Sequence, residues 1–208
     1  MVAGALSDSG IKHGSVVDAV VVVGEALTDE TLQDAVGMWC KGGSDREAVV
    51  ARFGEIGDWD VSAVTSFREL FHWQEDFNED ISRWDTSNVT TMYGMFNCAS
   101  SFNQSVEGWN TSNVTDMRYM FNNAGEFNAD ISKWNVEKVT NMRSMFENAK
   151  KFKADIGATW SGSAATDTQK DIFLGADAFN ELYECETLTN GPVSSCEKVR
   201  PPSPWRCD

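Results

Sequence analysis

A repeat of 25 residues constrains the fold of this chain more than any other feature. Tryptophan recurs at Trp59, Trp84, Trp109 and Trp134, and other apolar side chains keep the same step without a slip. These columns are Ile56, Ile81, Val106, Ile131 and Ile156; Val64, Val89, Val114 and Val139; Phe71, Phe96, Phe121 and Phe146; Phe77, Phe102, Phe127 and Phe152; Phe67, Met92, Met117 and Met142; and Leu70, Met95, Met120 and Met145. So many columns in one register predict tandem repeats from about Ile56 to Ile156.

Stacking explains why such columns exist. One unit of 25 residues cannot bury its own apolar side chains, so it buries them against the equivalent residues of its neighbours. The rows of Met are therefore interpreted as core, although Met also occurs on promiscuous binding surfaces. We expect an α/β repeat solenoid of about four leucine-rich-repeat-like turns, with helical N- and C-terminal caps and rows spaced about 4.8 Å apart.

Within a unit, two kinds of element are predicted. Phe77 to Ser82 and Phe127 to Ser132 are expected to be short strands. Val89, Met92, Phe96 and Ala99 would lie on one face of a helix, and Ser87 or Asn88 could cap that helix; a second short strand is the alternative.

Polar columns repeat as well: Thr65, Thr90, Thr115 and Thr140; Asn78, Asn103 and Asn128; and Asp80, Asp130 and Asp155. We expect these to hydrogen-bond between units or to close bends, and we favour turn chemistry over calcium binding for the Asp column.

The two ends differ from the repeats. Leu27 to Gly43 is predicted to be a helix capped by Thr28, and Ser44 to Glu47 to be a capping box for a second helix that ends near Gly54. Repetition fails after Ile156, and Asp167 to Tyr183 is predicted to form a C-terminal capping helix. The predicted organisation is an N-terminal arm (1–26), a helical N-terminal cap (27–55), the repeat solenoid (56–157), a C-terminal cap (158–188) and an extended tail (189–208).

The motifs resemble a known repeat family. Trp84 to Met92 (WDTSNVTTM) and Phe127 to Ser132 (FNADIS) are similar to the repeat of BspA-like leucine-rich-repeat surface proteins, which is also known as a domain of unknown function in mycoplasma lipoproteins and microalgae. The resemblance covers about Leu27 to Ile156. It implies a repeat stack used for adhesion or protein contact, and it brings no catalytic residues. Leu is nearly absent from the columns and LxxLxLxxN does not occur, so a straighter stack than the regular leucine-rich horseshoe is plausible.

Composition excludes several function classes. The net charge of −15 disfavours nucleic-acid partners and anionic membrane surfaces. The longest apolar stretch, Val16 to Val23, is too short to span a bilayer. Met1 to Gly14 lacks the features of a signal peptide, so we expect any targeting leader to be absent; the localisation is unknown, with the cell surface and an organelle-associated assembly as candidates. Neither His13 nor His72 lies in a nucleophile motif, so no enzyme, no cofactor and no metal are predicted.

Five cysteines occur without a CxxC pair, which disfavours zinc and thioredoxin-type sites. Cys98 is predicted to be a buried free thiol. Cys185, Cys196 and Cys207 crowd the last 24 residues, and an oxidising compartment would favour a Cys185–Cys196 or a Cys196–Cys207 bridge. Three unpaired thiols are the alternative.

Function is predicted where the repeats differ from one another. One column holds Arg68, Tyr93, Arg118 and Arg143, and the next includes Tyr119. Arg and Tyr are enriched in interface hot spots, so these five residues form a hypothetical protein-contact surface, with a solvated face as the alternative. The chain is interpreted as a non-catalytic protein-interaction module, adhesin-like or a recognition scaffold, with an unidentified protein partner. The alternative is a structural or linker subunit built into a large assembly.

Overall fold

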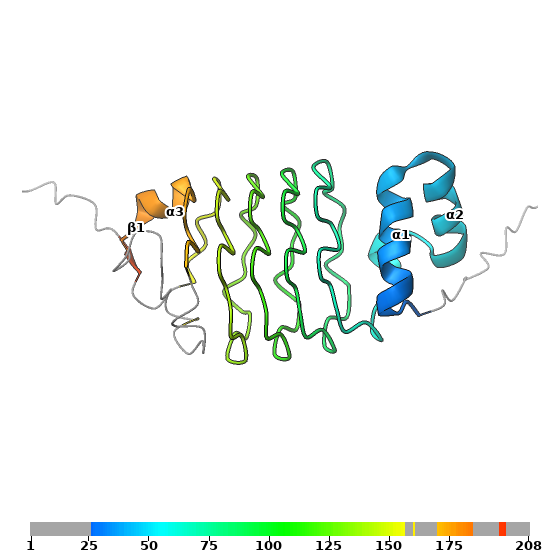
Figure 1. Ribbon diagram of the computed structural model, residues 1–208, viewed down its shortest axis with the longest axis horizontal. Helices are drawn as coiled ribbons and strands as arrows, with labels where there is room; N and C mark the ends of the chain where they lie inside the picture. Colours follow the sequence, from blue (N-terminus) through cyan, green and yellow to red (C-terminus); the bar gives the residue numbers. More distant parts are fainter. Residues whose placement is uncertain (1–25, 157–159, 161–169, 185–195, 199–208) are drawn as a thin grey trace, which may run out of the picture.

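The computed structural model describes residues 26–156, 160, 170–184 and 196–198. A helical hairpin, α1 (Asp29–Lys41) and α2 (Gly43–Phe53), lies at one end of a row of stacked repeat units, and α3 (Asp177–Leu182) lies at the other (Figure 1). A single 3₁₀ turn, η1 (Ile56–Asp58), leads from α2 into the first unit.

The hairpin begins as the sequence indicates. The Thr28 side chain accepts a hydrogen bond from the Thr31 N–H, which confirms Thr28 as the cap of α1. The capping box predicted at Ser44 is wrong, because α2 already begins at Gly43 and its N-terminus has no side-chain cap. Gly42, with φ of 75°, reverses the chain so abruptly that Ser44 falls inside the first helical turn.

The predicted α/β solenoid with leucine-rich-repeat-like turns is wrong. Between residues 59 and 156, all of which are described, the units contain neither α-helices nor β-strands, so Phe77–Ser82 is not a strand and Val89–Ala99 is neither helix nor strand. In place of strands, isolated parallel bridges run from Ser66 through Thr91 and Asp116 to Asn141.

Backbone hydrogen bonding explains the absence of strands in these units. Alternate N–H groups take different partners: those of Phe67, Glu69, Phe71 and Trp73 donate to carbonyls of the next unit, and those of Leu70, His72 and Gln74 close turns onto the carbonyl three residues back. Glu69 and Trp73 also have φ values of 55° and 62°, far from extended backbone. Each unit is therefore a series of turns, in which four of these seven donors join one unit to the next.

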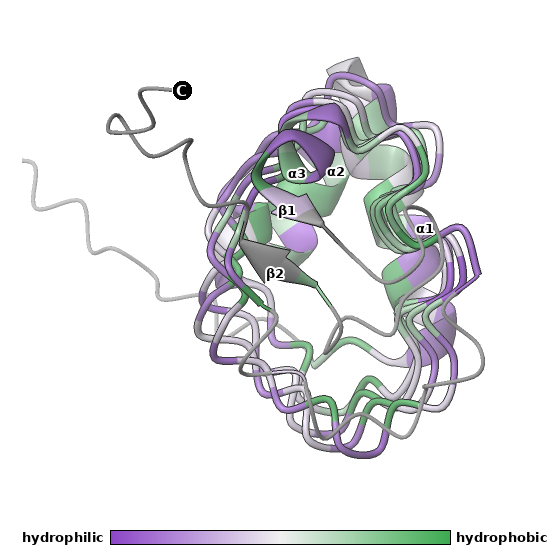
Figure 2. Ribbon diagram, turned by 90° about the vertical axis from the view of Figure 1, so that its left-hand side faces the viewer, coloured by the Kyte–Doolittle hydropathy of each residue, from purple (hydrophilic) through white to green (hydrophobic). Residues whose placement is uncertain are grey.

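Equivalent side chains nevertheless lie in continuous rows through the core. In Figure 2, the ribbons of successive units overlie one another and their hydrophobic positions, in green, are aligned. Phe71, Phe96, Phe121, Phe146 and Phe173 stack face to face with centroids 5.5, 5.5, 5.8 and 5.9 Å apart. The spacing exceeds the strand spacing of about 4.8 Å because aromatic rings pack in an offset arrangement. The prediction that the apolar columns form core rows is confirmed.

The repetition continues beyond Ile156, where the sequence predicted that it fails. Trp160 stacks on Trp134 at 6.4 Å and Phe179 stacks on Phe152 at 5.8 Å. The step is 26 residues for the tryptophans and 27 for the phenylalanines, so one extra unit with small insertions escapes a search for a fixed period. The helix predicted over Asp167 to Tyr183 is confirmed only for α3, because residues 170–175 form turns; residues 167–169 lie outside the described residues.

Polar side chains connect the units, as predicted. In the Thr column, the Thr90 hydroxyl donates to the Thr65 carbonyl at 3.1 Å. In the Asn column, the Asn78 Oδ1 accepts from the Asn103 N–H at 2.9 Å. Asp80 accepts a hydrogen bond from the N–H two residues ahead, at 2.9 Å, which is the bend chemistry expected of the Asp column.

The carboxylate of Asp29 joins the hairpin to the first unit. Its Oδ1 accepts hydrogen bonds from the N–H groups of Thr65 and Ser66, at 2.7 and 3.0 Å. In later units, the N–H of the equivalent Thr donates instead to a backbone carbonyl of the preceding unit. Burial raises the pKa of Asp29, but these bonds and one from the Thr65 hydroxyl outweigh it, so the pKa lies below its usual value.

At the other end, β1 (Tyr183–Glu184) pairs antiparallel with β2 (Glu197–Lys198), with Glu184 opposite Glu197. Cys196 is disulfide-bonded, while Cys185 and Cys207 lie outside the described residues. Most of the predicted N-terminal arm and extended tail also lies outside them. None of the helices in the described part combines the length and the hydropathy that crossing a membrane requires.

Candidate functional site

The stacking brings together the residues predicted to form a contact surface. We call Arg68, Tyr93, Arg118, Tyr119 and Arg143 the arginine–tyrosine row. The Arg68 and Arg118 guanidinium carbons lie 4.0 and 5.0 Å from the centroid of the Tyr93 ring. Tyr119 meets Tyr93 edge to face, with centroids 5.7 Å apart. The first four residues thus form one cluster that spans three repeat units.

Asp116 fixes the centre of this cluster. Its carboxylate accepts hydrogen bonds from Arg118 Nη2 at 2.6 Å and from Arg118 Nε at 3.0 Å. The side-chain hydrogen bond to Asp116 raises the pKa of Arg118 above its ordinary value. Arg118 is therefore a positioned and largely neutralised charge that supports the Tyr93 ring.

The outer arginines are more available. The Arg68 side chain is 54% exposed, and its contact with Glu69 is long, at 3.6 Å. Arg143 is exposed, and within the described residues it makes no ion pair. The Tyr119 N–H donates to the Arg143 carbonyl at 3.0 Å, so Arg143 extends the row by one unit without touching the tyrosine rings through any contact described.

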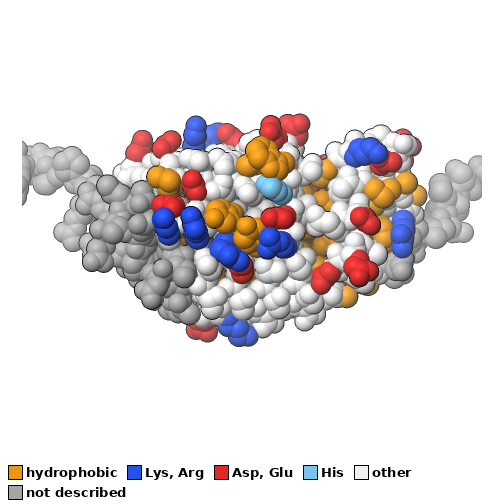
Figure 3. Space-filling model, in the orientation of Figure 1, with side chains coloured by type: hydrophobic (Ala, Val, Ile, Leu, Met, Phe, Trp, Pro, Cys, Tyr) orange, Lys and Arg blue, Asp and Glu red, His pale blue; other side chains and the backbone are white. Residues whose placement is uncertain are grey.

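Figure 3 shows Lys and Arg side chains gathered beside apolar ones over the middle of the repeat stack. Within the arginine–tyrosine row, Tyr93, Arg118 and Tyr119 are half-buried, and Arg68 and Arg143 are exposed. Tyr119 has a φ of 58°, in the column that holds Glu69, Gly94 and Ser144, all with positive φ. A bulky side chain is uncommon in this conformation, so the backbone conformation does not favour a tyrosine at this position.

Trp73 is a candidate that the sequence analysis missed. Its side chain is 63% exposed, the most among the large hydrophobic residues described, and its ring lies 5.6 Å from that of His72. The equivalent positions hold Cys98, Asn123 and Asn148. A lone tryptophan in a column of small side chains was a signal available in the sequence.

The titratable groups of the described part bear on two kinds of site, a metal site and a reactive thiol. No group of three or more His, Cys, Asp or Glu side chains there is placed to hold a metal ion. Cys40 is a free thiol, and burial raises its pKa to about 11. Cys98 is free as predicted but half-buried, and burial also raises its pKa. Both thiols are therefore protonated at neutral pH; His13 lies outside the described residues.

Stacked turns, continuous aromatic rows and a polar ladder between units define a tandem-repeat protein. The chain belongs to the family described as mycoplasma protein of unknown function, DUF285, whose matches cover residues 46–160 and 84–187 and together span more than half of the chain. No curated protein and no solved structure matches the chain. The family assignment agrees with the repeat resemblance, and it does not extend to the name BspA-like surface protein.

Proposed function

We propose that this chain is a protein-interaction repeat module that contacts its partner through the arginine–tyrosine row. One observation carries the proposal: Tyr93 is held between two guanidinium groups on the surface of a chain whose net charge is −15. Arg and Tyr dominate binding energy in protein interfaces, whereas a merely solubilising surface does not require them to be packed together. The resemblance to BspA-like surface proteins is consistent with this role.

Preorganisation supports the proposal. Binding loses free energy when side chains must be ordered, so residues already held in place bind at lower cost. Asp116 holds Arg118, and the two tyrosine rings support each other edge to face. Arg68 and Arg143, the exposed ends of the row, can then pair with carboxylates of the partner.

The test uses a phage-displayed library of random peptides, selected on the purified chain. The selected peptides are then measured against the double variant Arg68→Glu with Arg143→Glu. Both side chains are exposed, so folding should survive. The control, Lys138→Glu with Lys150→Glu, makes the same change in charge at exposed positions outside the row.

The proposal expects selected peptides to lose binding by about tenfold or more with the arginine variant, a loss of about 1.4 kcal/mol, and to bind the lysine variant like the original chain. It is refuted if the selected peptides bind both variants equally well, or if both variants weaken binding to the same extent. The second result would mean that only overall charge matters.

A further inference from the structure

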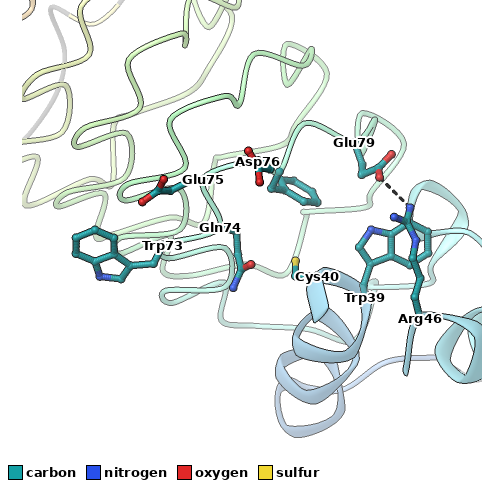
Figure 4. Close-up of a pocket in the computed structure, with 9 residues that line it drawn as sticks. Trp39, Cys40, Arg46, Trp73, Gln74, Glu75, Asp76 and Glu79 are labelled. Atoms are coloured by element: carbon teal, nitrogen blue, oxygen red, sulfur yellow. Dashed lines mark hydrogen bonds and ion pairs between the residues drawn. The ribbon is translucent and has the colours of Figure 1, made fainter. Parts of the chain in front are cut away.

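A cavity of about 420 Å³ opens between the helical hairpin and the first repeat (Figure 4). Trp39, Cys40 and Arg46 line it from α1 and α2, and residues 73–77 and Glu79 line it from the repeat. The Trp39 and Phe77 side chains are almost completely buried, so the walls rest on the packed core. Its volume is within the range of about 300–1,000 Å³ typical of ligand sites.

The lining carries an excess of negative charge. Glu75, Asp76 and Glu79 face a single cation, Arg46. Arg46 is already engaged, because its Nη2 lies 2.8 Å from the Glu79 carboxylate and its guanidinium stacks 3.9 Å from the Trp39 ring. In the described part of the chain, Glu75 and Asp76 make no ion pair, so two exposed carboxylates at the cavity have no counter-charge.

Trp73 is exposed beside these carboxylates at a backbone position that does not favour it. Its φ is 62°, a region that bulky residues avoid and Asn tolerates. Two equivalent positions do hold asparagine, Asn123 and Asn148. The tryptophan is therefore strained and 63% exposed, without any gain in core packing. Residues that break local rules without structural benefit are typical of functional sites.

Trp73 and Glu75 also line a second hollow of about 350 Å³, together with Cys98, Ser100 and Asn123. The indole and the carboxylate thus stand between two depressions. In Figure 4 the Trp73 ring projects away from the hairpin, with the Glu75 carboxylate above it. An extended peptide that crosses this ridge can place side chains in both hollows.

We propose that this acidic cleft binds an arginine side chain in a basic, extended segment of a partner protein. A guanidinium can stack on the Trp73 ring while it pairs with Glu75 or Asp76, and its planar fork suits both contacts. The charge of −15 attracts a basic segment toward the cleft. This site differs from the arginine–tyrosine row in both position and charge, so either proposal can be refuted without affecting the other.

The experiment measures fluorescence anisotropy with a labelled decapeptide of alternating Arg and Gly, and with the same peptide carrying neutral citrulline. The test variant is Trp73→Asn, which installs the residue found in equivalent positions. A second variant, Glu75→Gln with Asp76→Asn, removes the two carboxylates. The matched control, Glu137→Gln with Glu181→Gln, removes the same charge at exposed positions elsewhere.

The arginine peptide should bind the original chain, and the citrulline peptide should bind at least about tenfold more weakly. Trp73→Asn and the Glu75/Asp76 variant should each weaken binding about tenfold, whereas the control should change it less than twofold. The urea midpoint of Trp73→Asn should be unchanged or higher, which excludes unfolding as the cause. Absence of binding by the arginine peptide overturns the proposal, as does an equal loss in the control, which would indicate non-specific attraction to an acidic chain.

Discussion

Replacing Phe121 with alanine should destabilise the protein by about 5 kcal/mol, the upper end of the usual range for buried aromatic residues. The side chain is fully buried in a middle unit. Its ring stacks on Phe127 at 3.7 Å, on Phe96 at 5.5 Å and on Phe146 at 5.8 Å, and it also contacts Trp134 at 6.2 Å. Rings on both sides are held in rows, so the cavity left by truncation cannot easily collapse.

Urea unfolding followed by tryptophan fluorescence measures this loss. With a slope of about 2 kcal/mol per molar urea, 5 kcal/mol lowers the midpoint by about 2.5 M. Phe121→Leu, which retains most of the apolar volume, should lose clearly less. Hydrogen exchange should also show faster opening in the adjacent units, because repeat units are stabilised by their neighbours. A loss below about 1 kcal/mol, or one equal for Leu and Ala, would refute the argument that stacked rings hold the units together.

Two further predictions concern the ends of the stack. Asp29→Ala should destabilise the protein by about 1–2 kcal/mol at neutral pH. Hydrogen bonds lower the pKa of Asp29 in the folded state, so its contribution to stability is present above the ordinary Asp pKa and is lost as the pH falls through the folded-state pKa. The difference between the urea midpoints of the two proteins should therefore shrink as the pH falls from 7 to 3, and a constant difference would contradict this. When the β1–β2 register is continued by one residue, it predicts a disulfide bond between Cys185 and Cys196. Mass spectrometry of a digest made without reduction should find the peptide linked by this bond. A linked Cys196–Cys207 peptide would disprove the pairing.

The sequence determined the repeat, its period and the identity of the core. The columns of Trp, Phe, Val, Ile and Met are buried because one short unit has no other way to remove its apolar surface from water. The Thr and Asn columns connect adjacent units because a side chain lies at hydrogen-bonding distance from the backbone of the equivalent residue one unit away. A periodic pattern determines these features without reference to the path of the backbone.

The backbone conformation of the units depended on the tertiary structure. Spacings such as Val89, Met92 and Phe96 fit a helix, a strand or a series of turns equally well, and stacking selected the turns because they offer alternate N–H groups to the next unit. The fifth unit escaped the sequence analysis because insertions shift Trp160 and Phe173 from the period while the rings still stack. That two guanidinium groups lie against the Tyr93 ring, and that Trp73 lines an acidic cleft, depend on distances between residues of different units or of unit and hairpin. Only the folded chain sets those distances, because a repeat pattern specifies what is buried and leaves the exposed side chains free.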